Sequence, residues 1–250
     1  MNRKEVCLLV DNSNTRTKFA LSGTGGAVEV RVLPTADISV SSVLDLLRGW
    51  LFSRVCLCSV VPWAAACIRE ALHEYPLVNV SPHISATVDF ASYPGITTLG
   101  SDRVANALAA VNCASLPVVA VDLGTATTFD VVAGPLSHPV FRGGVIAPGY
   151  AAMATALCSR TAQLPDASVL VGGSVIGQNT RQAMSAAVRV GYPGMVDAIL
   201  DAVESELGER ISVILTGGDA ETVAPLLRRK CKIEPLLTLQ GIALAAGLRL

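Results

Sequence analysis

The chain has 250 residues, of which 51% are apolar and only 16% are charged, and its net charge is −1. This balance is typical of a globular protein with a large core and excludes a disordered chain. No basic block is present, which argues against nucleic acid as a partner.

The mean hydropathy of +0.52 is high and raises the question of a membrane segment. The longest apolar stretch, residues 55–68, contains Ser59 and Pro62 and falls short of the roughly 20 residues that span a bilayer. The N-terminal apolar run stops at Asp11, which is too early for a signal peptide. We therefore expect a cytoplasmic protein with no membrane partner, in which the cysteines are reduced and mostly buried.

The first half of the chain predicts three opening strands followed by alternating helices and strands. The strands fit Val6–Asp11, Arg16–Leu21, Val28–Leu33, Arg54–Val60 and Leu77–Val80, and the helices fit Ser42–Leu51, Trp63–His73 and the run 104–111.

The second half repeats this order. The predicted strands are Pro117–Asp122, Thr127–Val132, Val140–Ile146 and Ile211–Leu215. One helix is expected directly after Gly149, and the others fit Gly177 to about Glu206, Ala220–Arg228 and Gln240–Leu248. Three strands and then alternating elements, twice over, predict a duplicated α/β unit. We place the two halves at residues 1–114 and 115–250.

One turn occurs in both halves, where a buried strand ends in an aspartate followed by small and hydroxyl-bearing residues. The first copy is Asp11-Asn12-Ser13-Asn14-Thr15, and the second is Asp122-Leu123-Gly124-Thr125. Exposed backbone N–H groups and hydroxyls suit phosphate oxygens. Two such turns indicate half-domains that hold a nucleotide in a cleft between them. An ordinary polar hairpin is the alternative for the first copy, and a Thr-rich strand is the alternative for the second.

The charged residues of these turns have different expected roles. Lys18 adds a positive charge if it faces the phosphates. Asp11 would repel phosphate, so we expect it to hold a divalent metal. Asp122 lies at a strand end where a cation would sit, and Gly124 allows close backbone approach.

Another candidate site, Gly100-Ser101-Asp102-Arg103, lies before a predicted helix. Asp102 could simply cap the helix, and Arg103 could face solvent. The alternative pairs an acid that orients a hydroxyl with a guanidinium that binds a carboxylate or phosphate. The glycine segments 143–149 and 216–218 could likewise be anion or nucleoside sites, or plain turns.

Taken together, the motifs resemble those of type III pantothenate kinase, within the actin-like ATPase superfamily that includes hexokinases. The matching pieces, in order, are Asp11-x-Ser-Asn-Thr-x-x-Lys18, Tyr93-Pro94 leading to Gly100-x-Asp-Arg103, Asp122-x-Gly-Thr-Ala-Thr-Thr, Gly143-Gly-x-Ile-x-Pro-Gly149, Asn179-Thr180 and Thr216-Gly-Gly218. The resemblance implies an α/β fold of duplicated ribonuclease H-like (actin-like ATPase) domains, each a mixed sheet with flanking helices.

The same resemblance implies transfer of the ATP γ-phosphate to the primary hydroxyl of pantothenate, the first step of coenzyme A biosynthesis. It implies a homodimer that uses ATP with a divalent cation, expected to be Mg²⁺, and a monovalent cation, K⁺ or NH₄⁺. Asp102 would be the catalytic acid/base, and Asp122 would hold the monovalent cation. The pantothenate site would comprise Tyr93, Gly100, Ser101, Asp102, Arg103 and Thr180, and the ATP site Asp11, Asn12, Ser13, Asn14, Thr15, Arg16, Thr17, Lys18 and Thr125.

Two positions depart from the family pattern, because Ser13 and Ala187 stand where glycine is usual. A serine is strained at positive φ and adds a Cβ near the phosphates. The competing interpretations are a non-catalytic regulatory or accessory relative and another small-molecule kinase of the superfamily. The complete set Asp11, Lys18, Asp102, Arg103, Asp122 and Thr180 favours the active enzyme.

Overall fold

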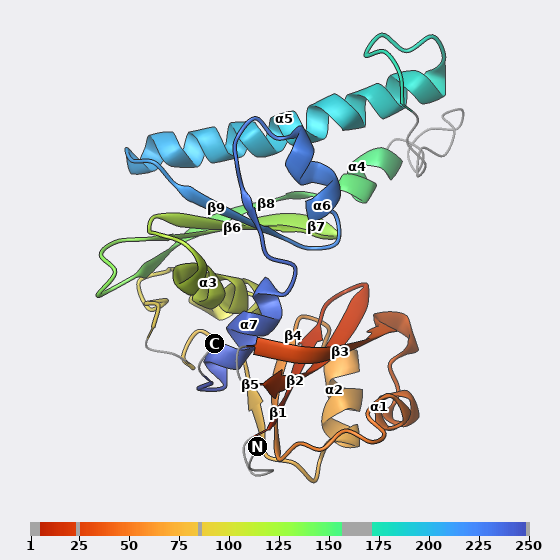
Figure 1. The fold of residues 1–250 in the computed structure, drawn as a ribbon, viewed down its shortest axis with the longest axis vertical. Helices are drawn as coiled ribbons and strands as arrows, with labels where there is room; N and C mark the ends of the chain where they lie inside the picture. Colours follow the sequence, from red (N-terminus) through yellow and green to blue (C-terminus); the bar gives the residue numbers. More distant parts are fainter. Residues whose placement is uncertain (1–5, 24–25, 85–86, 157–171, 249–250) are drawn as a thin grey trace. The chain divides into compact units, whose positions relative to one another are not determined.

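The computed structural model describes residues 6–23, 26–84, 87–156 and 172–248 (Figure 1). Contacts divide the chain into two units, each assembled from separate segments. One consists of residues 1–116, 131–143 and 236–250, and the other of residues 117–130 and 144–235. The predicted division of the duplicated halves between residues 114 and 115 stays a prediction.

The first sheet has the strand order β3-β2-β1-β4-β5, with the fully buried β1 (Cys7–Asn12) at its centre. β1 pairs antiparallel with β2 (Arg16–Gly23) and parallel with β4 (Arg54–Ser59). β3 (Gly26–Pro34) and β5 (Leu77–Asn79) form the two edges. The sheet is therefore mixed, and the end of β1 lies beside the end of β4.

Helices α1 (Val40–Leu46), α2 (Pro62–Ala71), α3 (Ser101–Cys113) and α7 (Leu237–Ala245) complete this unit. α3 and α7 pack closely, since a Cβ at Gly241 would overlap the backbone of Ala105. Three buried cysteines, Cys7, Cys56 and Cys58, lie in the sheet as thiols, as expected for core cysteines. Burial raises the pKa of the Cys56 thiol to about 12.

The second sheet has the order β10-β9-β6-β7-β8. Its strands are β6 (Val118–Leu123), β7 (Ala126–Ala133), β8 (Val140–Pro148), β9 (Ser212–Thr216) and β10 (Lys232–Ile233). Starting from β8, the strand order is β8-β7-β6-β9-β10, which matches β3-β2-β1-β4-β5 of the first sheet position by position. The parallel pair β6–β9 corresponds to the parallel pair β1–β4. The topology is therefore duplicated, which confirms the predicted fold class.

The helices of the second sheet are α4 (Tyr150–Thr155), the long α5 (Thr180–Leu207) and α6 (Ala220–Val223). Figure 1 shows α5 running along one face of the sheet. Across the described ranges, no helix combines the length and apolarity that a membrane crossing requires.

Several predicted helix bounds were wrong for local reasons. α1 begins before Ser42, because Ser39 and Ser42 form a capping box, and it ends at Leu46 rather than Leu51. The helix expected over Ala220–Arg228 ends at Val223, and a 3₁₀ turn that contains Pro225 follows it. The two-residue strand β10 was not predicted, since so short a strand has no periodicity.

Candidate functional site

The first copy of the repeated turn, residues 11–15, is called the first phosphate turn after its expected ligand, and it joins β1 to β2. A hydrogen bond from the Ser13 amide to the Arg16 carbonyl, at 3.3 Å, closes it. Asn14, Thr15 and Arg16 are exposed at its tip, whereas Asn12 and Thr17 are buried at its base.

Asp11 is buried under this turn and holds two partners. Its Oδ1 accepts a hydrogen bond from the Ser13 hydroxyl at 2.8 Å, and its Oδ2 lies 3.5 Å from Lys18 Nζ. Asp11 and Lys18 are paired across the antiparallel strands, so both side chains share one face of the sheet. Lys18 does face the turn, but part of its charge is balanced by Asp11.

The departure at Ser13 is compatible with the turn. No residue other than glycine has a positive φ in the part of the chain that the structure describes, so Ser13 adopts a backbone conformation open to L-residues. Its hydroxyl also gives Asp11 a hydrogen bond that a glycine could not donate. Ser13 is therefore free of the strain that a positive φ would impose, and the effect of its Cβ on ATP binding stays a prediction.

A network of polar side chains, of which Asn12, Thr17 and Thr35 are buried and Ser59 is half-buried, supports the turn. Asn12 Nδ2 donates to Thr17 Oγ1 at 2.8 Å, and Thr17 Oγ1 lies 3.0 Å from Thr35 Oγ1. The Thr35 hydroxyl donates to the Ser13 carbonyl at 2.7 Å, and the Ser59 hydroxyl donates to Asn12 Oδ1 at 2.6 Å. Asn12 and Thr17 were predicted for their place in the motif, whereas Thr35 and Ser59 were missed because they come from other elements.

The Gly-x-Asp-Arg segment forms the start of α3. Gly100 is the N-cap residue, and Asp102 lies in the first turn, where its Oδ1 accepts the Arg103 amide at 2.8 Å. A Cβ at Gly100 would lie 2.5 Å from Asp102 Oδ1, so the glycine makes room for the carboxylate. Burial raises the pKa of Asp102, and the negative charge of Asp11 adds to this effect.

Ser101, between these residues, makes contacts within the protein. Its hydroxyl donates to the Ser59 carbonyl at 2.9 Å and lies 3.4 Å from Cys58 Sγ. The start of α3 is thereby attached to the end of β4.

Tyr93 is held in a slot of small and aromatic residues in the same unit. Its ring meets Phe141 edge-on, with ring centroids 5.2 Å apart, and the Arg103 guanidinium lies 5.7 Å from the Phe141 centroid. Gly143 has a φ of +104°, and a Cβ there would lie 3.3 Å from the Tyr93 ring. The structure therefore brings both Tyr93 and Arg103 to the Phe141 ring, and it gives Gly143 a packing role that the sequence did not reveal.

The second copy of the turn, residues 122–125, is called the second phosphate turn and lies at the end of β6, where Gly217 and Gly149 pack against it. Gly217 has a φ of +92°, and a Cβ there would lie 2.5 Å from Asp122 Oδ1. A Cβ at Gly149 would overlap the carbonyl oxygens of Gly124 and Thr125. Segments 143–149 and 216–218 thus supply the glycines that allow the backbone to pack around this turn, and Thr125 remains exposed.

Two tyrosines behind this turn were missed. The buried Tyr192 of α5 has its hydroxyl 2.6 Å from Thr127 Oγ1, and its ring meets Tyr150 edge-on at 5.1 Å. Burial raises the pKa of the Tyr192 hydroxyl above its ordinary value. Neither tyrosine belongs to a motif. Tyr150 directly follows Gly149 as the first residue of α4, whereas only the packing of α5 brings Tyr192 to the turn.

Thr180 is exposed in the first turn of α5, directly after the N-cap Asn179, whose side chain accepts the Gln182 amide at 2.9 Å. Ala187 is exposed on the same helix.

The described residues contain no group of three His, Cys, Asp or Glu side chains that could hold a metal ion. This is compatible with Mg²⁺ in a kinase, because Mg²⁺ is bound there by one or two carboxylates together with substrate phosphates and water. The buried carboxylate of Asp11 has the chemistry of such a ligand, and its role as a metal ligand stays a prediction.

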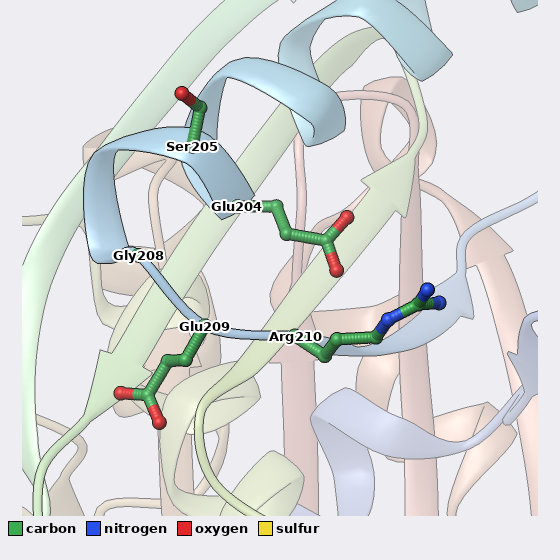
Figure 2. Close-up of a pocket in the computed structure, with 5 residues that line it drawn as sticks. All are labelled: Glu204, Ser205, Gly208, Glu209 and Arg210. Atoms are coloured by element: carbon green, nitrogen blue, oxygen red, sulfur yellow. The ribbon is translucent and has the colours of Figure 1, made fainter.

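One surface hollow lies at the C-terminal end of α5 (Figure 2). It has a volume of about 430 Å³ and is lined by Glu204, Ser205, Gly208, Glu209 and Arg210. It is formed by the end of a helix and contains none of the predicted site residues.

Comparison with known proteins gives a consistent picture. Residues 7–202 match the family model described as type III pantothenate kinase. A type III pantothenate kinase of Akkermansia muciniphila is 39% identical over 97% of this chain and 99% of its own length. Another, from Methylacidiphilum infernorum, is 35% identical over 95% of this chain and 86% of its own.

Solved structures show the same fold at low identity. A Campylobacter jejuni protein assigned to the Baf transcriptional-activator family aligns over 96% of this chain and 97% of its own, with a TM-score of 0.61 and 20% identity. A glucokinase from an Antarctic psychrotroph aligns over 97% and 98%, with a TM-score of 0.52 and 13% identity. An archaeal actin homologue aligns over 97% and 99%, with the same TM-score and identity. These likenesses establish the actin-like architecture.

Proposed function

This chain belongs to the type III pantothenate kinase family, and we propose that it transfers the γ-phosphoryl group of ATP to the primary hydroxyl of pantothenate. The product is 4'-phosphopantothenate, and the reaction is the first step of coenzyme A biosynthesis. The observation that carries this proposal is the match over residues 7–202, which includes both phosphate turns and the Gly-x-Asp-Arg segment.

Asp102 is the proposed acid/base of this reaction. A primary alcohol is a far weaker acid than aspartic acid, whose pKa is about 3.9, so Asp102 does not remove the proton in the ground state. In a loose phosphoryl-transfer transition state the nucleophile need not be deprotonated in advance. Asp102 therefore orients the hydroxyl and accepts its proton as the O–P bond forms. Burial, which raises the pKa of Asp102, makes it a better proton acceptor.

The remaining roles follow the chemistry of each side chain. Arg103 suits the carboxylate of pantothenate, since a guanidinium can bind both oxygens. We assign Tyr93, Gly100, Ser101 and Thr180 to the same substrate, Ser101 through its backbone, because its hydroxyl donates to the Ser59 carbonyl.

We assign the turn from Asp11 to Lys18, together with Thr125, to ATP. Its N–H groups and hydroxyls suit phosphate oxygens, and Asp11 suits the accompanying divalent ion. When bound, that ion neutralises charge on the phosphates. We assign Asp122 to K⁺ or NH₄⁺. We also propose that the enzyme is a homodimer and works in the cytoplasm, where ATP is available.

A coupled assay of ADP release tests the function. We expect turnover that requires both Mg-ATP and pantothenate, and that rises when Na⁺ is replaced by K⁺ or NH₄⁺. Absence of pantothenate-dependent turnover with all three ions would refute the proposed reaction. Equal turnover with the three ions would refute only the role given to Asp122.

A further inference from the structure

Ser59 lies at the end of β4, between two parts of the predicted site that are far apart in sequence. Ser59 lies outside all the sequence motifs that carry the family resemblance. Its hydroxyl and its peptide group nonetheless contact both the first phosphate turn and the start of α3.

On the side of the phosphate turn, Ser59 is attached to Asn12 at two points. The Ser59 hydroxyl donates to Asn12 Oδ1 at 2.6 Å, and the amide of Val60 donates to the Asn12 carbonyl at 3.1 Å. Asn12 is 1% exposed, and its Nδ2 donates a hydrogen bond to Thr17 on the other side of the turn. Both ends of the turn therefore depend on this attachment.

On the side of α3, the carbonyl of Ser59 accepts the Ser101 hydroxyl at 2.9 Å. The Ser59 hydroxyl also accepts the Val61 amide at 3.1 Å, which fixes the direction of the chain after β4. The Ser59–Val60 peptide group thus bonds Asn12 through its N–H and Ser101 through its C=O. One rigid peptide plane joins the two segments.

We propose that Ser59 is a positioning residue, which holds the first phosphate turn at a fixed position relative to the start of α3. Ser101 contributes to the same positioning by donating to the Ser59 carbonyl. The inference rests on the proposed function, in which the turn binds ATP phosphates and α3 carries Asp102. Phosphoryl transfer depends on this alignment, because a misplacement of about 1 Å can cost roughly 10²-fold in rate.

The first test is the steady-state kinetics of Ser59→Ala. We expect kcat to fall about 10- to 100-fold and the KM for ATP to rise, with a smaller change in the KM for pantothenate. Ser59→Thr keeps the hydroxyl on a residue that strands accept, so it should recover most of the loss.

Ser39→Ala is the matched control, because Ser39 caps α1 through a comparable hydroxyl bond and touches none of the site residues. It should lower stability and leave kcat and both KM values unchanged. Wild-type kinetics in Ser59→Ala, or an equal loss in Ser39→Ala, would overturn the proposal.

The second test is a double-mutant cycle with Ser101→Ala. Residues that act as one unit are strongly non-additive, so the double variant should be at most about twofold slower than the worse single variant. If the fold-losses in kcat of the two single variants multiply in the double variant, the two hydroxyls act independently, and the shared positioning role is refuted.

Hydrogen exchange separates a failure of this inference from a failure of the proposed function, since it needs no turnover. Ser59→Ala should speed exchange in residues 11–18 and also in residues 101–104, while α1 stays unchanged. Faster exchange in residues 11–18 alone would overturn the inference, whatever reaction the protein catalyses.

Discussion

Asp102 is subject to opposing influences that set when it can accept a proton. Burial raises its pKa, and the Asp11 charge acts in the same direction, whereas the Arg103 amide and guanidinium oppose them. The net shift is upward. A carboxylate accepts a proton only when it is ionised. For the role proposed for Asp102 we therefore expect full activity above the raised pKa and loss of activity as the pH falls through it.

Replacing Asp102 with asparagine should therefore remove both the proton acceptor and this pH dependence. We expect kcat to fall about 10²- to 10⁴-fold, equivalent to roughly 3–5 kcal/mol, with little change in ATP binding. In the wild type, kcat/KM should decline on the acid side at a pH above the usual range of aspartate, and this limb should be missing in the variant. Asp45→Asn, on the exposed face of α1, is the control. A wild-type kcat in Asp102→Asn would rule out the assigned role.

The neighbouring glycines Gly217 and Gly218 allow a sharp test of the second phosphate turn. An alanine at Gly217 is strained by a φ of +92°, and its Cβ would lie 2.5 Å from Asp122 Oδ1, whereas nothing lies within 4 Å of a Cβ at Gly218. Gly217→Ala should raise the KM for ATP and weaken activation by K⁺, and it should lower stability by about 1–3 kcal/mol. Gly218→Ala should resemble the wild type. Equal behaviour of the two variants in kinetics and thermal unfolding would contradict the packing described here.

At the level of elements, α5 is anchored by a buried carboxylate near its middle. Asp197 Oδ2 accepts both the backbone amide of Arg228, at 3.0 Å, and its Nε, at 3.2 Å. Arg229 extends the cluster to Asp201 and Glu204. The contacts join the 28-residue helix to the segment between α6 and β10.

Asp197→Ala should lower the free energy of unfolding by about 1–3 kcal/mol, because the backbone amide of Arg228 loses the charged, buried carboxylate that accepts its hydrogen bond. The exposed Asp201 offers a matched control, since surface ion pairs contribute at most about 1 kcal/mol. Urea denaturation followed by circular dichroism gives both values. Similar midpoints for Asp197→Ala and Asp201→Ala would show that burial does not set the strength of this anchor.

The sequence predicted most strands and long helices, because their apolar periodicity is local. It did not predict where α1 begins or that β10 exists, since these depend on the Ser39–Ser42 capping box and on pairing with β9. The same distinction applies to the site. Asp11, Asp102 and Asp122 carry recognisable motifs, whereas Ser59 and Tyr192 become relevant only when β4 and α5 bring them beside the turns.

At the scale of the whole molecule, the repeated strand order is the clearest consequence of the sequence. Two aspartate turns predicted two similar sheets, and the parallel pairs β1–β4 and β6–β9 occupy equivalent positions. The copies have nonetheless diverged in what surrounds the aspartate. Asp11 is buried between Ser13 and Lys18, while Asp122 lies beside Gly217, so one carboxylate is partly neutralised and the other is packed against backbone.

Ligand binding to the folded chain should be visible as a shift in global stability. A ligand at 100 times its Kd stabilises by about 2.7 kcal/mol, which for a chain of this size raises Tm by roughly 5–10 °C. We expect Mg-ATP to give such a shift in differential scanning fluorimetry. Pantothenate should add to it in Asp102→Asn, where turnover is about 10²- to 10⁴-fold slower and consumes far less of the ligands. Asp201→Ala should show the same ligand-induced shifts as the wild type from its own baseline. A shift with Mg-ATP but none with pantothenate would favour a nucleotide-binding relative without this substrate, and no shift with Mg-ATP would contradict the assignment of the first phosphate turn.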